Sequence, residues 1–131
     1  MSTTTFLNEV NLGGCGGLAA KIAESPDVAA NPVEQLLAAL GNCLAVGCAA
    51  NASIAGIEIE DMQIALEGDL DLRTFLGLKS ENAGYEAIRV KVDITSDATE
   101  DQLQALHTKV TGSSPVGHTL SRPVPVQIDL A

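Results

Sequence analysis

The feature that most constrains this fold is a long apolar segment, Asn31 to Ala55, with the sequence NPVEQLLAALGNCLAVGCAANASIA. Asn31 is a favoured N-cap residue, Pro32 suits the first helical position, and Gly56 follows as a stop signal. A helix of this length measures about 36 Å. Because it is apolar on almost every side, it must be buried on every side. We therefore predict a buried central helix.

A membrane span is the first alternative for this segment. Polar residues interrupt it and leave Leu36 to Ala50 as the apolar part, which is shorter than the roughly 20 residues that a bilayer requires. The net charge of −10 also argues against anionic membrane surfaces and nucleic acid, which attract clustered lysine and arginine. We expect neither a membrane nor a nucleic acid among the partners.

The three cysteines are irregularly spaced and do not indicate a disulfide framework. The N-terminus, MSTTTFLNEV, has no basic stretch followed by an apolar one, so we expect no secretory signal. Reduced thiols and a cytoplasmic location follow from that expectation. The two histidines are isolated and no Cys-x-x-Cys spacing occurs, so we expect no metal and no other cofactor.

Beyond the long helix the pattern changes to the two-residue alternation of strands. Strands are predicted at Met62 to Glu67 and Ile88 to Ile94. Val124 to Leu130 alternates in the same way, and the prolines at its start indicate an edge strand. A short helix is predicted from Thr99 to Val110, with a capping box between Thr99 and Gln102.

Two further regions are less regular. Gly68 to Ala87 forms a long excursion whose leucines and Phe75 should pack against the body, and such excursions often serve an interface or a site. Residues 1–30 form a short N-terminal strand region. Strands are predicted there at Phe6 to Leu12 and Leu18 to Ala23, joined by a flexible GGCGG turn that carries Cys15.

These elements predict an α+β fold in a single domain spanning residues 1–131. A small antiparallel sheet can cover one side of the long helix, and the short helix can cover part of another. Little of the chain remains to cover the rest. The simplest solution is a two-fold homodimer with the long helices at its centre.

Cys43 lies near the middle of the long helix, in GNCLAVG, and is either inert filler or a reactive group. Free cysteine is among the most buried residue types, so spacing alone favours a structural role. Cys48 is five residues further, with Cα atoms about 8–9 Å apart on a helix. That exceeds the reach of a disulfide. Cys48 is predicted to be core packing, and Cys15 an exposed thiol.

The histidines give weak functional signals. His107 is predicted on the exposed side of the short helix. His118 lies in SSPVGHTL, a predicted loop that could approach the long helix, where it could act as a base or a hydrogen-bond donor. An exposed polar residue without a function is the better explanation of His118. A Ser–His–acid triad has no support, since no GxSxG motif occurs.

Several segments together resemble the OsmC/Ohr family of osmotically inducible proteins and organic hydroperoxide reductases. They occur in family order as PVEQLLAALGNCLA, GIEIEDMQIALEGDLDLRTFLGL, IRVKVDI, ATEDQLQALH, SPVGHTL and RPVPV. The resemblance covers residues 31–131 as its core. It implies an OsmC-like fold in which an intertwined homodimer buries two central helices between antiparallel sheets.

The resemblance also implies a mechanism. Cys43 matches the peroxidatic cysteine, which attacks an organic hydroperoxide and becomes a sulfenic acid. Glu34 matches the glutamate at the helix start only approximately, because nine residues place it half a revolution from Cys43. Ser114 occupies the position of the resolving cysteine and cannot form its disulfide. The family's N-terminal arginine has no counterpart, because Arg73 is the first arginine and Lys21 is a weak substitute.

The resemblance thus implies a branch of the family without the second, resolving cysteine, and three functions stay open. The first is a thiol-dependent peroxidase in the oxidative or osmotic stress response, reduced by an external thiol or by Cys15. The second is a non-catalytic dimer that binds a small apolar ligand at its interface, with Cys43 lining the pocket. The third is a structural stress protein without a ligand. Reactive thiolates need nearby positive charge, and none is assigned to Cys43.

Overall fold

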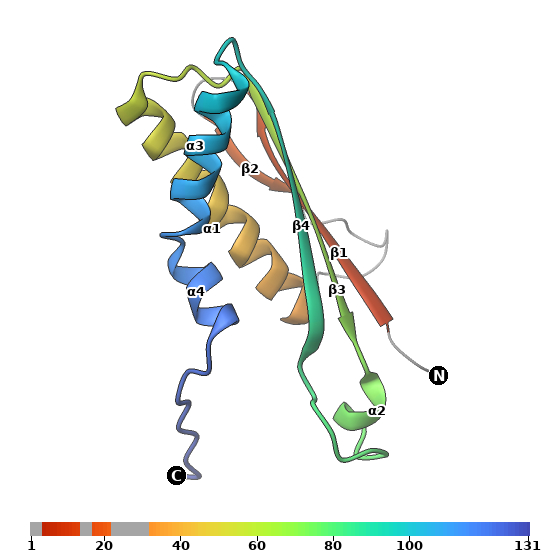
Figure 1. Ribbon diagram of the computed structural model, residues 1–131. Helices are drawn as coiled ribbons and strands as arrows, with labels where there is room; N and C mark the ends of the chain where they lie inside the picture. Colours follow the sequence, from red (N-terminus) through yellow and green to blue (C-terminus); the bar gives the residue numbers. More distant parts are fainter. Residues whose placement is uncertain (1–3, 14–16, 22–31) are drawn as a thin grey trace.

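A four-stranded antiparallel sheet, with helices on one of its faces, organises the chain (Figure 1). The computed structural model describes residues 4–13, 17–21 and 32–131. The sheet has the order β2-β1-β3-β4. Its strands are β1 (Thr4–Gly13), β2 (Gly17–Lys21), β3 (Asp61–Leu70) and β4 (Tyr85–Thr95). The helices are α1 (Pro32–Ala55), α2 (Leu72–Phe75), α3 (Glu100–Thr111) and α4 (Pro115–Ser121). This is the α+β architecture that the sequence predicts.

The predicted central helix is confirmed as α1, which runs unbroken from Pro32 to Ala55. It ends where Gly56 adopts a positive φ of 70°, a conformation that glycine enters without steric cost. Its burial is one-sided, however. Leu36, Val46 and Ile54 are 38%, 52% and 77% exposed. Within one chain, therefore, the expected burial on every side is not achieved.

By length and composition α1 could also cross a membrane. Its packing favours a core helix instead, because it lies against β1, β3, α3 and α4. The core combines one face of α1 with the inward face of β3. Its fully buried large side chains are Leu37, Met62, Ile64 and Leu66.

β3 confirms the predicted alternation. Met62, Ile64 and Leu66 of β3 are buried, and the residues between them are more exposed. The outward face is polar, since Arg89 of β4 pairs with Glu67 and Asp69 of β3. β4 is an edge strand, and in the described part of the chain its hydrogen-bonded strand neighbour is β3.

The predicted short helix is confirmed as α3, with the capping box between Thr99 and Gln102 in place. Leu106 and Val110 of α3 are buried. A Cβ at Gly47 of α1 would lie 3.0 Å from Val110 Cγ1. The glycine therefore permits the close approach of α3 to α1.

Three sequence predictions are wrong for the single chain. SSPVGHTL, predicted as a loop, forms α4, because Ser114 caps the helix and Pro115 suits its first position. Residues 123–131 form no strand. Two of them are prolines without an N–H group, and the segment runs away from α4 (Figure 1). In this segment Val126, Ile128 and Leu130 are 76%, 89% and 102% exposed.

The third error concerns the excursion, which the structure narrows to residues 71–84, between β3 and β4. Phe75, Leu76 and Leu78 are exposed rather than packed down. The excursion continues past the end of the sheet, where α1 does not reach it (Figure 1). The two predicted N-terminal strands are confirmed as β1 and β2, and Cys15 lies outside the described residues.

Candidate functional site

The structure brings Cys43 of α1 together with Ser114, the N-cap residue of α4. The Ser114 Oγ lies 3.3 Å from the Cys43 Sγ, within hydrogen-bond distance for sulfur. Cys43 is half-buried, whereas Ser114 is only 4% exposed. Two sequence-predicted site residues that are 71 positions apart therefore meet in one place.

Local sequence chemistry holds Ser114 there. Its Oγ accepts a hydrogen bond from the Gly117 N–H at 3.0 Å, the usual contact of an N-cap residue with the third residue of a helix. The His118 N–H donates to the Ser114 carbonyl oxygen and closes the first turn of α4. The Ser-Pro pair therefore fixes both the helix start and the serine side chain.

Cys48 is confirmed as core packing. It is 2% exposed and belongs to the main apolar cluster. Burial raises the pKa of its thiol, so the uncharged form is favoured. Of the two thiols in the described residues, Cys43 is therefore the one open to chemistry.

A groove of about 710 Å³ opens beside this pair. Apolar side chains of α1 and β4 form two of its walls, including Leu40, Leu44 and Val90. Ser114 lines it from the start of α4, whereas Cys43 does not line it. His107 and His118 also line the groove, and both are exposed. No hydrogen bond from either histidine to Cys43 occurs in the described residues.

Glu34 lies away from this pair along the helix axis. Because α1 is continuous, nine residues separate Glu34 from Cys43 by about 13.5 Å. Glu34 acts instead on Tyr85, at the start of β4. Burial and, secondarily, the charge of Glu34 raise the pKa of Tyr85 to about 12. The Tyr85 hydroxyl donates to the Val33 carbonyl oxygen at 2.7 Å and ties β4 to α1.

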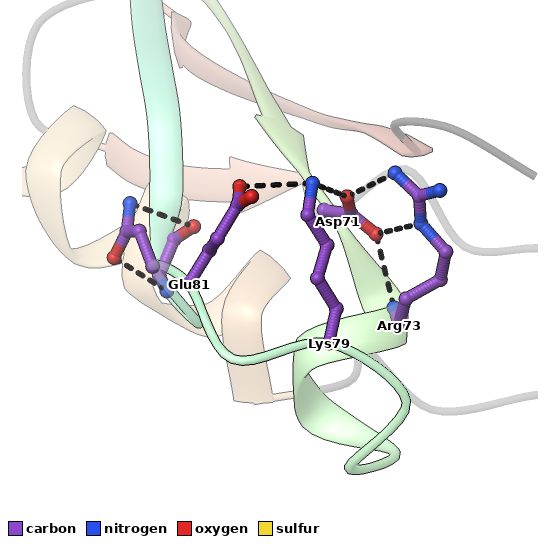
Figure 2. A network of polar contacts seen from close by, with 6 residues as sticks. Asp71, Arg73, Lys79 and Glu81 are labelled. Carbon is purple, nitrogen blue, oxygen red and sulfur yellow. Dashed lines mark hydrogen bonds and ion pairs between the residues drawn. The ribbon is translucent and has the colours of Figure 1, made fainter.

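The cations with ion pairs lie elsewhere. Figure 2 shows Arg73 and Lys79 around Asp71 in the excursion. Arg73 Nη2 lies 2.7 Å from Asp71 Oδ2, and Lys79 Nζ lies 2.8 Å from Glu81 Oε2. No ion pair in the described residues places a cation at Cys43. Of Lys21, the structure describes only its place at the end of β2.

Metal binding finds no geometric support in residues 4–13, 17–21 and 32–131, where no three histidine, cysteine, aspartate or glutamate residues cluster. Sequence reasoning missed two residues that build the site. Gly117 anchors the serine, and Tyr85 lines the groove. The Ser-Pro helix start was a readable signal for Gly117, three residues after Ser114.

Comparisons with known proteins agree with this architecture. The family model described as "OsmC-like protein" matches residues 24–129. A crystal structure of an OsmC-like hydroperoxide resistance protein from Jannaschia sp. CCS1 superposes with a TM-score of 0.75. It shares 13% sequence identity, and the match covers 100% of this chain and 95% of that chain. At this identity the likeness establishes the fold. No curated protein sequence matches.

Proposed function

This chain belongs to the OsmC-like protein family, and on that premise we propose that it reduces organic hydroperoxides through the thiol of Cys43. The observation that carries the proposal is the placement of Cys43 against Ser114 beside an apolar groove. The structural neighbour is named a hydroperoxide resistance protein, which supports the same substrate class. The apolar walls of the groove suit the organic part of such a substrate.

The catalytic cycle requires an external thiol as the reductant. The Cys43 thiolate attacks the terminal oxygen of the hydroperoxide, so an S–O bond forms and the O–O bond breaks. The leaving alkoxide takes a proton and becomes an alcohol, while the sulfur is oxidised by two electrons to a sulfenic acid. Ser114 cannot resolve this acid as a disulfide. A first external thiol then forms a mixed disulfide with loss of water, and a second releases Cys43.

The direct test is sulfenic acid trapping. After one equivalent of cumene hydroperoxide, dimedone should label the wild-type protein at Cys43. The Cys43→Ser variant should lose the label, and Cys48→Ser, which removes a buried thiol, should keep it. Labelling that is absent in the wild type, or unchanged in Cys43→Ser, contradicts the proposed function.

The proposal includes an intertwined homodimer. Its support is the apolar surface that one chain leaves uncovered, on α1, in the excursion and in residues 123–131, together with the edge position of β4. Sedimentation at low micromolar concentration should show one dimeric species. A stable folded monomer would contradict it. Family membership supports a soluble protein, and we place it in the cytoplasm, where thiols stay reduced.

A second function has one observation in its favour. Apolar side chains of α1 and β4 line much of the groove, and Cys43 does not line it. This arrangement fits a non-catalytic dimer that binds a small apolar ligand. Saturable binding of such a ligand by a protein that gives no dimedone label would select this alternative.

A further inference from the structure

The Ser114 hydroxyl has two neighbours with different hydrogen-bond roles. Its oxygen accepts from the Gly117 N–H at 3.0 Å and lies 3.3 Å from the Cys43 sulfur. A hydroxyl carries one proton to donate. The Gly117 N–H takes one acceptor position of this oxygen, and the hydrogen bond to the sulfur runs from Ser114 Oγ to Cys43 Sγ. An ionised sulfur has no proton of its own, so it can only accept this bond.

We propose that Ser114 is a positioning residue that stabilises the ionised form of Cys43 by donating this hydrogen bond. Reactive thiolates usually have a cation nearby, and within the described residues Ser114 is the hydrogen-bond donor that lies at Cys43. A hydrogen bond to an ionised acceptor is roughly twice as strong as a neutral one. Because Ser114 is 4% exposed, water has little access to replace it. A benefit to catalysis rests on the proposed peroxide chemistry. The hydrogen bond from Ser114 to Cys43 is independent of that proposal.

The serine at position 114 therefore gives up disulfide formation in favour of stronger hydrogen-bond donation. A thiol at this place could form a disulfide but would be a weak hydrogen-bond donor. A hydroxyl cannot form the disulfide and is the better donor. With serine at this position the site keeps a hydrogen-bond donor at Cys43 and depends on an external reductant.

The local backbone is built around this hydroxyl. A Cβ added at Gly117 would lie 3.1 Å from both the Cβ and the Oγ of Ser114. Any larger residue at position 117 would press on the serine side chain. The glycine therefore keeps the hydroxyl within reach of both partners.

The test measures ionisation of Cys43 directly, by thiolate absorbance at 240 nm against pH, in a Cys15→Ser background. Subtraction of the same titration for Cys43→Ser removes every other contribution. The midpoint for Ser114→Ala should lie about one pH unit above that of the wild type, since a hydrogen bond to a charged group is lost. Ser114→Thr keeps the hydroxyl and should restore most of the shift.

Coincident midpoints in Ser114→Ala and the wild type would overturn the inference. If Ser114→Ala does not fold by circular dichroism, Gly117→Ala decides by the same criterion, because it displaces the hydroxyl without removing it. A Ser114-dependent midpoint without peroxide-driven dimedone labelling would refute the proposed function alone. Labelling with a midpoint independent of Ser114 would refute this inference alone.

Discussion

Asp71 and Ser114 are the two buried polar residues of residues 32–131, and each caps a short helix. Asp71 accepts hydrogen bonds from the Arg73 backbone and side chain and from Lys79, all within eight residues (Figure 2). Ser114 instead reaches Cys43, 71 residues away. Both side chains cap a helix, but the other hydrogen-bond partners of Asp71 are charged side chains, whereas that of Ser114 is a thiol.

The two caps differ in the partners that their side chains bind. The Asp71 carboxylate has matched cations, so its charge is neutralised within the excursion. The Ser114 hydroxyl instead donates to the sulfur of Cys43, which lies on a different helix. The local partners of Asp71 indicate a structural role, whereas the contact of Ser114 with a thiol is the basis of the role in reactivity that we propose.

The largest expected effect is a new disulfide in Ser114→Cys. The Ser114 Oγ already lies 3.3 Å from the Cys43 Sγ, so a modest shift gives the bonding distance of about 2.05 Å. Mild oxidation followed by mass spectrometry should find positions 43 and 114 bridged. Ser113→Cys is the matched control, because Ser113 is exposed and bonds to the Lys109 carbonyl oxygen instead. An unbridged Ser114→Cys protein would mean that the two residues do not face each other.

A smaller effect is expected at the other cap. Asp71→Asn keeps the shape of the side chain but loses its charged hydrogen bonds, and it should lower the Tm by about 5 °C. Dimedone labelling of Cys43 should not change. A variant with unchanged Tm but altered labelling would reverse the roles that we give the two caps.

The two caps should also differ in how much stability the protein loses at acid pH. The Arg73 hydrogen bonds hold the pKa of Asp71 well below its unfolded value of about 3.9. The stabilisation is therefore complete above that unfolded value and is lost as the pH falls towards the folded one. Denaturation followed between pH 5 and pH 2 should show a smaller acid loss for Asp71→Asn than for the wild type. Ser114→Ala should keep the full acid loss.

The smallest effect is expected at Gly77, which follows α2 with a φ of 75°. A Cβ there would meet nothing within 4 Å, so Gly77→Ala should cost only the backbone strain, about 1 kcal/mol of unfolding free energy. Gly117→Ala is the contrasting change, because its cost is steric contact with Ser114. Urea denaturation of both variants checks this. A shift of the Cys43 midpoint in Gly77→Ala would contradict the separation of the two regions.

Most of the fold could be predicted where the signal was local. The N-cap and stop residues of α1, the alternation of β3 and the capping box of α3 all act within a few residues. The exception is α4, whose Ser-Pro start is also local but was interpreted as a loop. The other errors arose where the outcome depends on what lies nearby in space. Residues 123–131 alternate like a strand, yet they do not pair with the edge of β4, and the excursion leaves its apolar side chains exposed.

The candidate site followed the same division. The resemblance identified positions 43 and 114, and the structure then brought them within 3.3 Å. The partner of Glu34 and the contribution of Gly117 depend on packing between α1, β4 and α4, which spacing in the sequence does not encode. The catalytic roles of these residues stay predictions.

The pairing of β1 with β3 has a consequence for how the chain folds. Thr4 lies opposite Leu70, and the whole of α1 falls within the loop that this pairing closes. Closing so long a loop costs more entropy than closing the β3–β4 hairpin, which is joined by residues 71–84. We expect β3 and β4 to pair first, α1 to collapse onto them, and the β1–β2 hairpin to dock last. In the native protein, that N-terminal hairpin should then be the first part to open to amide hydrogen exchange.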